Sequence, residues 1–401
     1  MNNGDVQFET SVIHHGYSSR KHHDSLTPPI YPSSTFAFAN AKQGEERFSG
    51  EQEGYIYSRL SNPTVKILEE RMAELEKGDQ ALAFSSGMAA VSAVLLALTK
   101  SGDHILCSKG VYGCTFGLLQ FMQEKYAIGH DFSNLDTEEE IRKRILPTTT
   151  CIYVETPINP TMQVIDLTLL SGIAKEYSIP VVVDNTFSSP YLQQPLALGC
   201  DLVIHSATKY IGGHGDVVAG IAVGKKDIMT TIQKTTQKDI GGILSPFDAW
   251  LLLRGLKTLA IRMDRHTENA AKVFSFLKQH ELIDKIYYPG DPDHPDYRIA
   301  KQQMKKPGGL LSFTIRGGKE MAQKLMDSLQ LIQIAVSLGD AETLIQHPAT
   351  MTHAVVPEEN RLIMGITDGL LRLSVGLEHA DDLCRDLEQA LSKTLAASKM
   401  V

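Results

Sequence analysis

The sequence predicts an α/β protein in which helices cover both faces of a mostly parallel sheet. Between about residues 80 and 225, short runs that are apolar throughout alternate with helical stretches. Such fully apolar strands are typical of parallel sheets that are buried on both sides. A long helical pattern begins at Ser245 and leads into a second, smaller α/β region. We therefore expect an N-terminal arm at residues 1–61, a large domain at 62–260 and a small C-terminal domain at 261–401.

The composition excludes several classes of protein. The 401 residues include 39 basic and 47 acidic side chains, which makes the net charge −8, and 42% are hydrophobic. This hydrophobic content is enough for a large core, and an acidic chain does not favour nucleic acid or an anionic membrane. The longest strongly apolar stretch, at residues 88–98, is far shorter than the roughly 18 residues that a membrane span needs. No nucleic-acid or membrane partner is expected.

The compartment is indicated by the first residues and by the cysteines. MNNGDVQFET has no basic segment followed by an apolar one, so we expect no signal peptide. The five cysteines form no CxxC pair, and their odd number fits reduced thiols. We therefore expect a cytoplasmic protein.

The arm lacks a regular hydrophobic period and carries three prolines before residue 33. The first helix of the large domain follows it. Asn62 is placed to cap this helix, Pro63 to occupy its first position and Gly78 to close it. Its apolar stripe consists of Val65, Leu68, Met72 and Leu75.

Apolar runs in the large domain are the expected strands, at residues 104–107, 151–155, 181–184, 202–205 and 217–223. Helical stretches such as residues 167–177 lie between them. From Ser245, with Pro246 at its first position, we expect one long helix to about His266.

The small domain is expected to combine helices with short strands, among them residues 310–315 and 370–375. It ends in an amphipathic helix whose leucines are spaced by four, namely Leu383, Leu387, Leu391 and Leu395.

Several familiar motifs are absent from the sequence. There is no GxxxxGK[ST] loop, no HExxH and no GxSxG. The glycine-dense stretch at residues 212–220 lacks the GxGxxG spacing of a dinucleotide site. Histidines and cysteines are scattered without the spacing of metal ligands, so no metal is expected.

The chemistry of the protein is indicated by residues at the ends of the predicted strands. Glu155 ends one strand and Asp184 another, and Lys209 follows a third. Ligands of open α/β sheets bind beyond the carboxyl ends of the strands. Pyridoxal phosphate needs a lysine for its Schiff base and an acid beside its ring nitrogen. Ser206 and Thr208 flank the lysine, and the glycine of SSGMAA, at the start of an apolar helix, could hold the phosphate.

These motifs resemble the Cys/Met metabolism family of fold-type-I pyridoxal-phosphate enzymes. The strongest likeness is VVVDNTF followed by SATKYIGGHGDVVAG. The further fragments that match are YSRLSNPT (57–64), SSGMAA (85–90), VYGCT (111–115), ETPINP (155–160), SPFDAWLLLRGLKTL (245–259), SLGDAETLIQHPATMTH (337–353) and LRLSVGLE (371–378). Together they are highly specific and extend over nearly the whole chain. The resemblance implies a fold-type-I transferase fold, with a mostly parallel seven-stranded sheet in the large domain.

The resemblance also implies roles at the cofactor ring. Lys209 would form the Schiff base and move protons between the substrate and the cofactor. Asp184 would keep the ring nitrogen protonated, although an aspartate at a strand end is also a common turn residue. Tyr112 would stack on the ring and protonate the leaving sulfur, with its pKa lowered by a cationic cofactor and an arginine. Asn159 would contact the phenolic oxygen, and Glu155 would lie behind it.

The phosphate has its own set of implied partners. These are the backbone N–H groups of Gly87 and Met88, the hydroxyls of Ser206 and Thr208, and Ser86 at the helix start. Tyr57 and Arg59 would reach the phosphate of a neighbouring subunit, so a dimer with shared sites, paired further into a tetramer, is implied. On the residues alone, Tyr57 and Arg59 could equally be an ordinary loop pair.

Substrate contacts are implied for Arg372, which would bind the substrate carboxylate with help from Ser337 and Thr352. A solvated arginine at a strand end is the alternative for Arg372.

Three further features resemble the methionine γ-lyase branch of the family and are assigned to the substrate, namely Cys114, the pair Lys238 and Asp239, and Val336. An apolar Val336 suits a neutral S-methyl group better than a charged one. The alternatives are a small buried cysteine, a solvated loop pair and a packing valine.

The resemblance therefore predicts a carbon–sulfur lyase that acts on a small sulfur amino acid. The expected reaction is the α,γ-elimination of L-methionine to methanethiol, 2-oxobutanoate and ammonia, with homocysteine as a further substrate. A cystathionine γ- or β-lyase or an O-acetylhomoserine sulfhydrylase is the alternative within the family. A binding protein that holds the cofactor without catalysis is a more remote one.

Overall fold

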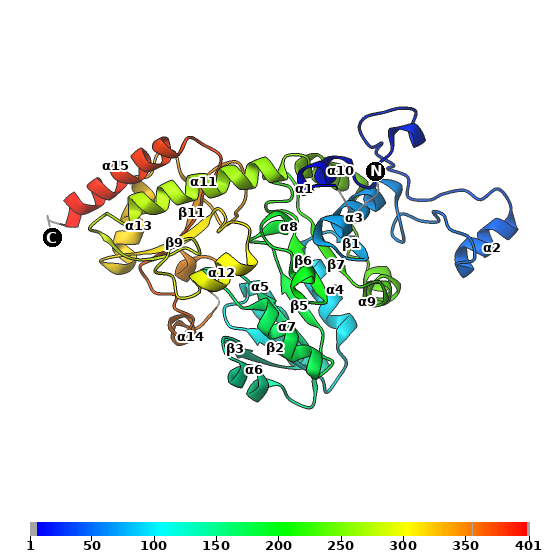
Figure 1. Ribbon diagram of the computed structural model, residues 1–401, viewed down its shortest axis with the longest axis horizontal. Helices are drawn as coiled ribbons and strands as arrows, with labels where there is room; N and C mark the ends of the chain where they lie inside the picture. The colour runs from blue at the N-terminus through cyan, green and yellow to red at the C-terminus, as the bar shows by residue number, and fades with distance from the viewer. Residues whose placement is uncertain (1–5, 355, 399–401) are drawn as a thin grey trace.

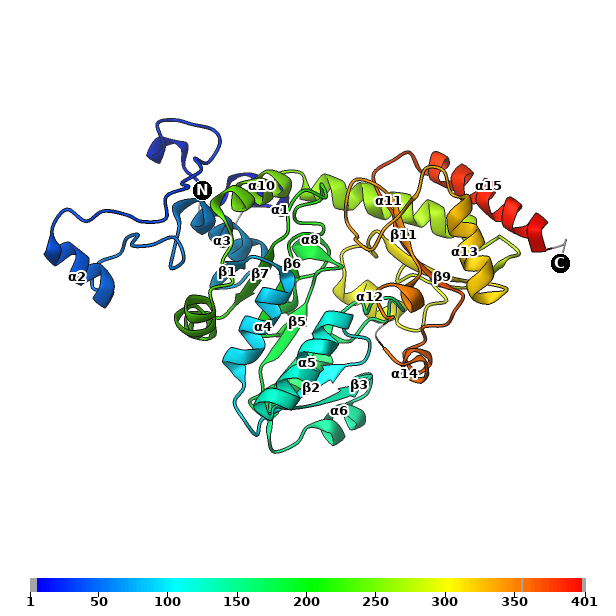
Figure 2. The same ribbon diagram turned by 180° about the vertical axis from the view of Figure 1, so that it is seen from behind.

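The computed structural model describes residues 6–354 and 356–398. Its body contains two sheets, and an arm extends from the large one (Figure 1). The helix α11 (Leu259–Leu277) runs from the large sheet towards the small one, as the reverse view also shows (Figure 2). Residues 1–5, which form part of the segment in which no signal peptide is expected, lie outside the described residues.

The large sheet has seven strands in the order β1-β7-β6-β5-β4-β2-β3. The bounds are β1 (Gln80–Phe84), β2 (His104–Ser108), β3 (Gly129–Ser133), β4 (Thr149–Glu155), β5 (Val181–Asp184), β6 (Leu202–Ser206) and β7 (Gly220–Gly224). Only β7 runs against its neighbours, with antiparallel pairing to β1 and β6. The predicted seven-stranded, mostly parallel sheet is confirmed.

The runs predicted as strands lie in β2, β4, β5, β6 and β7, although β7 begins at Gly220 rather than at residue 217. The strands β1 and β3 were not predicted. The strand β3 is an edge strand with the sequence GHDFS, and it is partly exposed. It therefore lacks the apolar run by which the buried strands are recognised.

The helices around the large sheet begin with α3 (Pro63–Glu76), which Asn62 caps as predicted by accepting from Thr64 N at 2.9 Å. The others are α4 (Gly87–Leu98), α5 (Gly113–Tyr126), α6 (Glu138–Arg144), α7 (Leu167–Glu176), α8 (Ser189–Leu192), α9 (Lys226–Ile232) and the π-helix η3 (Gln233–Ile240). The expectation that Gly78 closes α3 is wrong, because Lys77 takes the left-handed conformation with φ 61°. Gly78 follows this residue, and its N–H still donates to Ala73 O at 2.9 Å; a Cβ on Gly78 would lie 2.6 Å from Val223 Cγ1.

The single long helix expected from Ser245 is wrong, because the structure has two helices, α10 (Pro246–Leu256) and α11. Tertiary hydrogen bonds explain the break. Arg262 donates to Gly255 O at 3.0 Å and to Tyr210 O at 2.8 Å. The carbonyl group of Gly255 lies near the end of α10, and that of Tyr210 lies in the turn after β6, so Arg262 ties the break to this turn.

The small sheet has five strands in the order β10-β11-β12-β9-β8. They are β8 (Ile283–Tyr287), β9 (Leu310–Ile315), β10 (Gln333–Ile334), β11 (Leu344–Gln346) and β12 (Leu370–Ser374). The strands predicted at residues 310–315 and 370–375 are confirmed as β9 and β12. The neighbouring helices are α12 (Tyr297–Gln303), α13 (Gly318–Ser328), α14 (Glu358–Ile363) and α15 (Ala380–Ser398). The leucine stripe of α15 packs into the core of this sheet.

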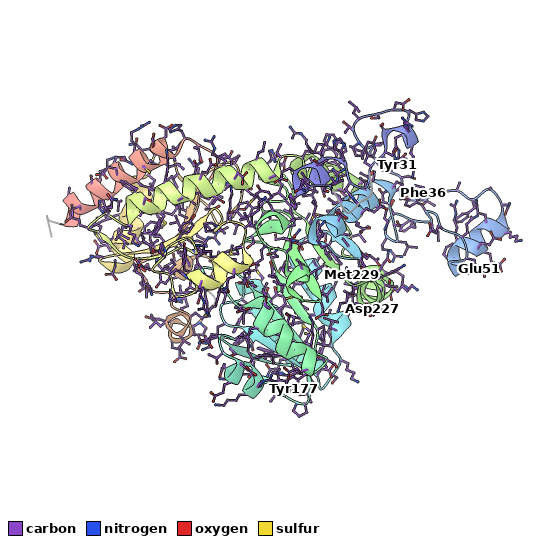
Figure 3. The ribbon with its side chains drawn as sticks, viewed as in Figure 1. Tyr31, Phe36, Glu51, Tyr177, Asp227 and Met229 are labelled. Carbon is purple, nitrogen blue, oxygen red and sulfur yellow. The ribbon has the colours of Figure 1, made fainter. Side chains whose placement is uncertain are left out.

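The arm contains two short α-helices, α1 (Phe8–His14) and α2 (Ala41–Ser49), with the 3-10 helix η1 (Ser19–Lys21) between them. Tyr31, Phe36 and Glu51 lie along the arm and away from both sheets (Figure 3). The predicted boundaries at residues 61 and 260 stay predictions, and α11 spans the second one.

Among the described residues, no helix is both long and apolar enough to cross a membrane. The five cysteines, all within the described ranges, are free thiols.

Candidate active site

A cleft of about 280 Å³ opens at the carboxyl ends of β4, β5 and β6. It collects most of the site residues predicted from the sequence, namely Ser86, Gly87, Met88, Tyr112, Glu155, Asn159, Asp184, Ser206, Thr208, Lys209, Val336, Thr352 and Arg372. Ser337 touches the cleft through a hydrogen bond. The lining does not include Tyr57, Arg59, Cys114, Lys238 or Asp239.

Lys209 lies in the turn after β6, where its N–H donates to Ser206 O at 3.1 Å. Its Nζ donates to Ser337 Oγ at 3.1 Å. Burial, together with the nearby charge of Arg372, lowers the pKa of Lys209. A lysine with a lowered pKa more readily supplies the neutral amine that attacks a carbonyl group or takes a proton.

Two carboxylates face the cleft from neighbouring strands, because Glu155 pairs with Asp184 in the register of β4 and β5. The hydroxyl of Tyr153 lies 3.5 Å from both Glu155 Oε1 and Asp184 Oδ2. Burial raises the pKa of Asp184 and holds that of Glu155 well above its usual value. A cation is therefore favoured here, and the protonated ring nitrogen of pyridoxal phosphate would supply it.

Asp184 also fills the alternative role considered for it, since its Oδ1 accepts from Thr186 N at 3.0 Å. This turn fixes the carboxylate at the strand end. The structural role and the proposed cofactor role are therefore compatible.

A cradle for an anion lies at the start of α4. Ser86 caps this helix by accepting from Ala89 N at 3.0 Å, and the N–H groups of Gly87 and Met88 have no partner within the helix. A Cβ on Gly87 would lie 2.9 Å from Ser206 Cβ, so only glycine lets the helix start approach Ser206 this closely. Thr208 stands beside them, with its hydroxyl accepting from Ala219 N at 3.0 Å. The cradle fits the phosphate of pyridoxal phosphate.

Tyr112 immediately precedes α5, and its N–H donates to Glu155 Oε1 at 2.8 Å. Burial is the main cause that raises the pKa of Tyr112 to about 12, helped by a hydrogen bond with Cys114, while Arg372 acts in the opposite direction. The expected lowering of this pKa is therefore wrong for the protein groups alone. The phenol keeps its proton at neutral pH, as a proton donor must.

Arg372 comes from β12, so the small sheet contributes to the cleft. It donates to Asn159 Oδ1 at 3.1 Å and to Ser337 O at 2.8 Å. The residue is only 3% exposed, which excludes a solvated arginine. Its Nε is buried and has no partner among the described residues. Burial lowers the pKa of Arg372 to about 10, so it stays charged and can bind a carboxylate.

The features that resemble the methionine γ-lyase branch have different places. Val336 lines the cleft and is 59% exposed, and Thr352 lines it with its hydroxyl accepting from Gln346 Nε2 at 3.2 Å. Cys114 is exposed and lies beside Tyr112, so it is not a small buried residue.

The remaining predicted residues form a second cluster outside the cleft. Arg59 donates to Lys238 O and lies over the ring of Tyr57, 5.8 Å from its centroid. Lys238 Nζ lies 3.4 Å from Asp239 Oδ1. The arm and the π-helix η3 thus bring these four residues together.

Three residues of the site were not predicted from the sequence, namely Tyr153, Thr186 and Asp340. Tyr153 precedes Glu155 by two residues on β4, and strand alternation could have placed it on the same face. Thr186 follows Asp184 with the spacing of an Asx turn. Burial raises the pKa of Asp340, while a hydrogen bond with Ser337 and the nearby charge of Lys209 act in the opposite direction. Asp340 stands in the matching fragment at residues 337–353, but no local period reveals its proximity to Lys209, which lies on a distant segment of the chain.

The chain is similar to known proteins over almost its full length. The model of a family described as Cys/Met metabolism PLP-dependent enzyme matches residues 9–392. An L-methionine gamma-lyase of Fusobacterium nucleatum subsp. nucleatum is 47% identical over 386 residues, which cover 96% of this chain and 98% of that protein. A cystathionine gamma-lyase of Bacillus subtilis is 45% identical, with 96% and 98% covered. The crystal structure of cystathionine gamma-lyase from Lactobacillus plantarum complexed with L-serine has a TM-score of 0.92 at 42% identity, covering 97% of this chain and all of that one.

Proposed function

The chain belongs to the Cys/Met metabolism family of PLP-dependent enzymes, and on this premise we propose that it is a carbon–sulfur lyase that converts L-methionine and water to methanethiol, 2-oxobutanoate and ammonia. Homocysteine is proposed as a further substrate. The main support for the proposal is that one cleft is lined by Lys209, Asp184, Tyr112 and Arg372 together. Relatives named L-methionine gamma-lyase at 45–47% identity support it.

Each residue has a proposed task in the elimination. When bound, the cofactor supplies a ring that takes up the negative charge left as protons leave the substrate carbons. Arg372 binds the substrate carboxylate, and Lys209 Nζ takes the proton from Cα and moves one at Cβ. Tyr112 donates its phenolic proton to the sulfur as the Cγ–S bond breaks. Asp184 holds the proton of the ring nitrogen.

Residues of the cradle hold the cofactor in place. Gly87 and Met88 donate their N–H groups to the phosphate, with the hydroxyls of Ser206 and Thr208 beside them. None of these phosphate donors is a basic side chain, so the anion is bound by N–H and hydroxyl groups.

Methionine is favoured over cystathionine by the exposed Val336 at the cleft, since an apolar side chain suits an S-methyl group. A cystathionine lyase or an O-acetylhomoserine sulfhydrylase is the alternative, because cystathionine lyases of 44–45% identity are also similar to this chain. Non-catalytic binding of the cofactor is disfavoured by the complete set of four reactive residues.

We also propose a dimer in which Tyr57 and Arg59 complete the partner's site, with two dimers in a tetramer. Support comes from the position of both residues on the arm, outside their own cleft, together with Lys238 and Asp239. We also propose a cytoplasmic location, because the five cysteines are free thiols.

The shared site is tested by subunit exchange. A chain with Arg59→Ala and a chain with Lys209→Ala are each expected to be inactive, and mixed dimers to recover part of the activity. No recovery after verified exchange would contradict the shared site.

The substrate is tested by product analysis with L-methionine and L-cystathionine supplied separately. The proposal predicts methanethiol with 2-oxobutanoate from methionine, and a lower kcat/KM for cystathionine. Val336→Glu should shift this preference towards cystathionine, while Val336→Leu serves as the apolar control. Efficient cystathionine cleavage with inert methionine would establish the alternative.

A further inference from the structure

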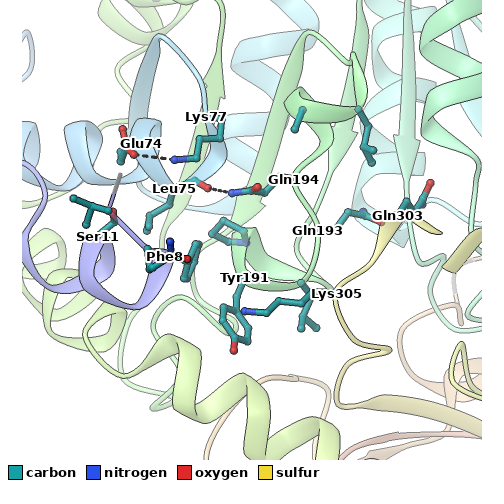
Figure 4. Close-up of a pocket in the computed structure, with 16 residues that line it drawn as sticks. Phe8, Ser11, Glu74, Leu75, Lys77, Tyr191, Gln193, Gln194, Gln303 and Lys305 are labelled. Atoms are coloured by element: carbon teal, nitrogen blue, oxygen red, sulfur yellow. Dashed lines mark hydrogen bonds and ion pairs between the residues drawn. The ribbon is translucent and has the colours of Figure 1, made fainter. Parts of the chain in front are cut away.

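A second cavity, of about 470 Å³, lies between α1, the end of α3 and α8 (Figure 4). Its two lysines are already paired with glutamates, Lys77 with Glu74 at 2.9 Å and Lys305 with Glu9 at 3.3 Å. This cavity therefore offers no free cation to an anionic ligand. Buried polar atoms without a partner gather elsewhere, around the arginine assigned to the substrate carboxylate.

A row of polar side chains crosses the small sheet on the face that brings Arg372 into the cleft. Arg372 of β12 pairs with Gln346 of β11 and with Ser312 of β9 in the antiparallel register. Directly paired residues share one face, with Cβ atoms about 4.5–5.5 Å apart. The opposite face, which carries Ile345 and Leu373, packs into the core of the small domain. Since Gln346 and Ser312 are 0% exposed, the row is a buried wall beside the arginine.

Four buried atoms in and beside this row have no hydrogen-bond partner among the described residues, namely Arg372 Nε, Ser312 Oγ, Gln346 Oε1 and His353 Nε2. The guanidinium of Arg372 has only N–H donors and a positive charge. A neighbouring amide is therefore most stable with its oxygen turned towards the guanidinium and its NH2 group turned away. The structure has the amide of Gln346 in the orientation that leaves Nε2 free for a contact outside the row.

That contact is with Thr352, which lines the cleft. The Thr352 hydroxyl accepts from Gln346 Nε2 at 3.2 Å and lies 3.0 Å from His353 Nδ1. The turn after β11 holds this segment, because the N–H of His353 donates to Pro348 O at 2.9 Å. A Cβ on Gly113 would lie 2.8 Å from Thr352 O, so Thr352 also packs closely against the start of α5. The threonine is thus fixed from both domains.

The contacts of the Thr352 oxygen decide where its own proton points. A hydroxyl accepts two hydrogen bonds and donates one, and Gln346 Nε2, which can only donate, uses one lone pair. Burial, together with the charges of Arg372 and Arg361, lowers the pKa of His353 to about 4, so the ring is neutral at pH 7 and has one N–H. With that hydrogen on Nε2, a buried N–H would lack an acceptor, which is costly. With it on Nδ1, the ring donates to Thr352, and the hydroxyl proton is left for the cleft.

We propose that Gln346 is a positioning residue for the substrate carboxylate, because its donation to Thr352 turns the threonine hydroxyl so that this hydroxyl donates to the carboxylate bound by Arg372. Gln346 is not in the lining of the cleft, and Thr352 makes the contact with the substrate. This role deepens the proposed function and rests on it, since it requires that Arg372 binds a carboxylate.

The test compares two ligands of the cofactor-loaded enzyme by calorimetry. L-Norleucine has the carboxylate but no sulfur to eliminate, and pentylamine is the same chain without the carboxylate. Thr352→Val should weaken norleucine binding by about tenfold or more, which is the loss of one hydrogen bond to a charged group. Gln346→Leu should weaken it by about three- to tenfold, because the hydroxyl stays but is no longer oriented. The double variant should lose no more than Thr352→Val, since Gln346 acts through Thr352. Pentylamine should bind all three variants as it binds the wild type.

Gln389→Leu is the matched control, because Gln389 lies on α15 of the same domain and its Nε2 donates to Ser328 O at 2.7 Å, away from the lining of the cleft. It should leave both Kd values unchanged. If Gln346→Leu does not fold, Gln346→Glu decides the matter. It keeps the shape of the side chain but replaces the donor by an acceptor, and it should weaken norleucine binding at least as much.

A folded Gln346 variant that binds norleucine as tightly as the wild type would overturn the role of Gln346 alone. An equal loss for pentylamine, or losses that add in the double variant, would also overturn it, since they would indicate general structural damage. A wild-type enzyme that binds norleucine no more tightly than pentylamine would overturn the assignment of Arg372 as well, so the two failures are distinguishable.

Discussion

Replacing Arg372 by lysine keeps the charge but removes the planar fork, and the structure indicates what this costs. Arginine has five N–H donors, and two contacts already serve Asn159 Oδ1 and Ser337 O. The buried Nε is among the donors left for a substrate carboxylate. A lysine has three N–H donors on one nitrogen, whereas Asn159 Oδ1, Ser337 O and the two carboxylate oxygens are four acceptors, so at least one charge-assisted hydrogen bond is lost.

One such bond contributes about 1.5–3 kcal/mol, which corresponds to about a 10- to 150-fold lower kcat/KM for Arg372→Lys. We expect most of the loss in KM, because the carboxylate is bound before and during the reaction alike. The assay is steady-state kinetics with L-methionine, together with a titration of cofactor binding. The cofactor Kd should stay within about threefold, because Arg372 is not among the phosphate donors.

Arg262→Lys is the control for changing a buried arginine. Arg262 bonds Tyr210 O and Gly255 O, away from the lining of the cleft. It should lower the melting temperature while leaving KM nearly unchanged. An unchanged kcat/KM in Arg372→Lys would refute the assignment of Arg372 to the substrate carboxylate.

Three further changes test other parts of the site. Gly87→Ala places a Cβ 2.9 Å from Ser206 Cβ and should weaken cofactor binding by about tenfold or more. The control is Gly117→Ala on α5, whose Cβ would meet nothing within 4 Å and which should leave cofactor binding unchanged. Equal cofactor Kd values for the two variants would contradict the assignment of the cradle to the phosphate. Tyr112→Phe should lower kcat by about 100-fold or more with little change in cofactor absorbance, and unchanged turnover would exclude this tyrosine as the acid. Burial raises the pKa of Glu69 from 4.5 to about 7, so the contribution of its protonated form to stability is present below pH 4.5 and lost as the pH rises to about 7. Glu69→Gln should therefore raise the unfolding free energy at pH 8 by up to about 3 kcal/mol and change it little at pH 4.5. Urea titrations at both pH values measure this difference.

Much of the large sheet could be predicted from the sequence because its central strands are buried on both faces. The strands β4, β5 and β6 are continuous apolar runs, and their ends place Glu155, Asp184 and Lys209 at one edge by topology alone. The edge strand β3 was not predicted, because its polar residues interrupt any continuous apolar run. The two residues of β10 are too short for any period to show.

What could not be predicted depends on contacts between distant segments. Arg372 meets Asn159 across 213 positions, and Arg59 meets Lys238 across 179. The break between α10 and α11 depends on Arg262, whose partner Tyr210 lies 52 positions away. The pKa of Tyr112 depends on burial, which no local pattern reveals. Sequence periodicity describes neighbours along the chain and does not reveal contacts between distant segments.

Covalent attachment of the cofactor to Lys209 is the claim on which the site depends. Borohydride reduction of the cofactor-loaded enzyme, followed by digestion and mass spectrometry, tests it directly. We expect one modified peptide that contains Lys209, and none from the Lys209→Ala variant. A modified lysine elsewhere in the chain, or no modification of the wild type, would contradict it.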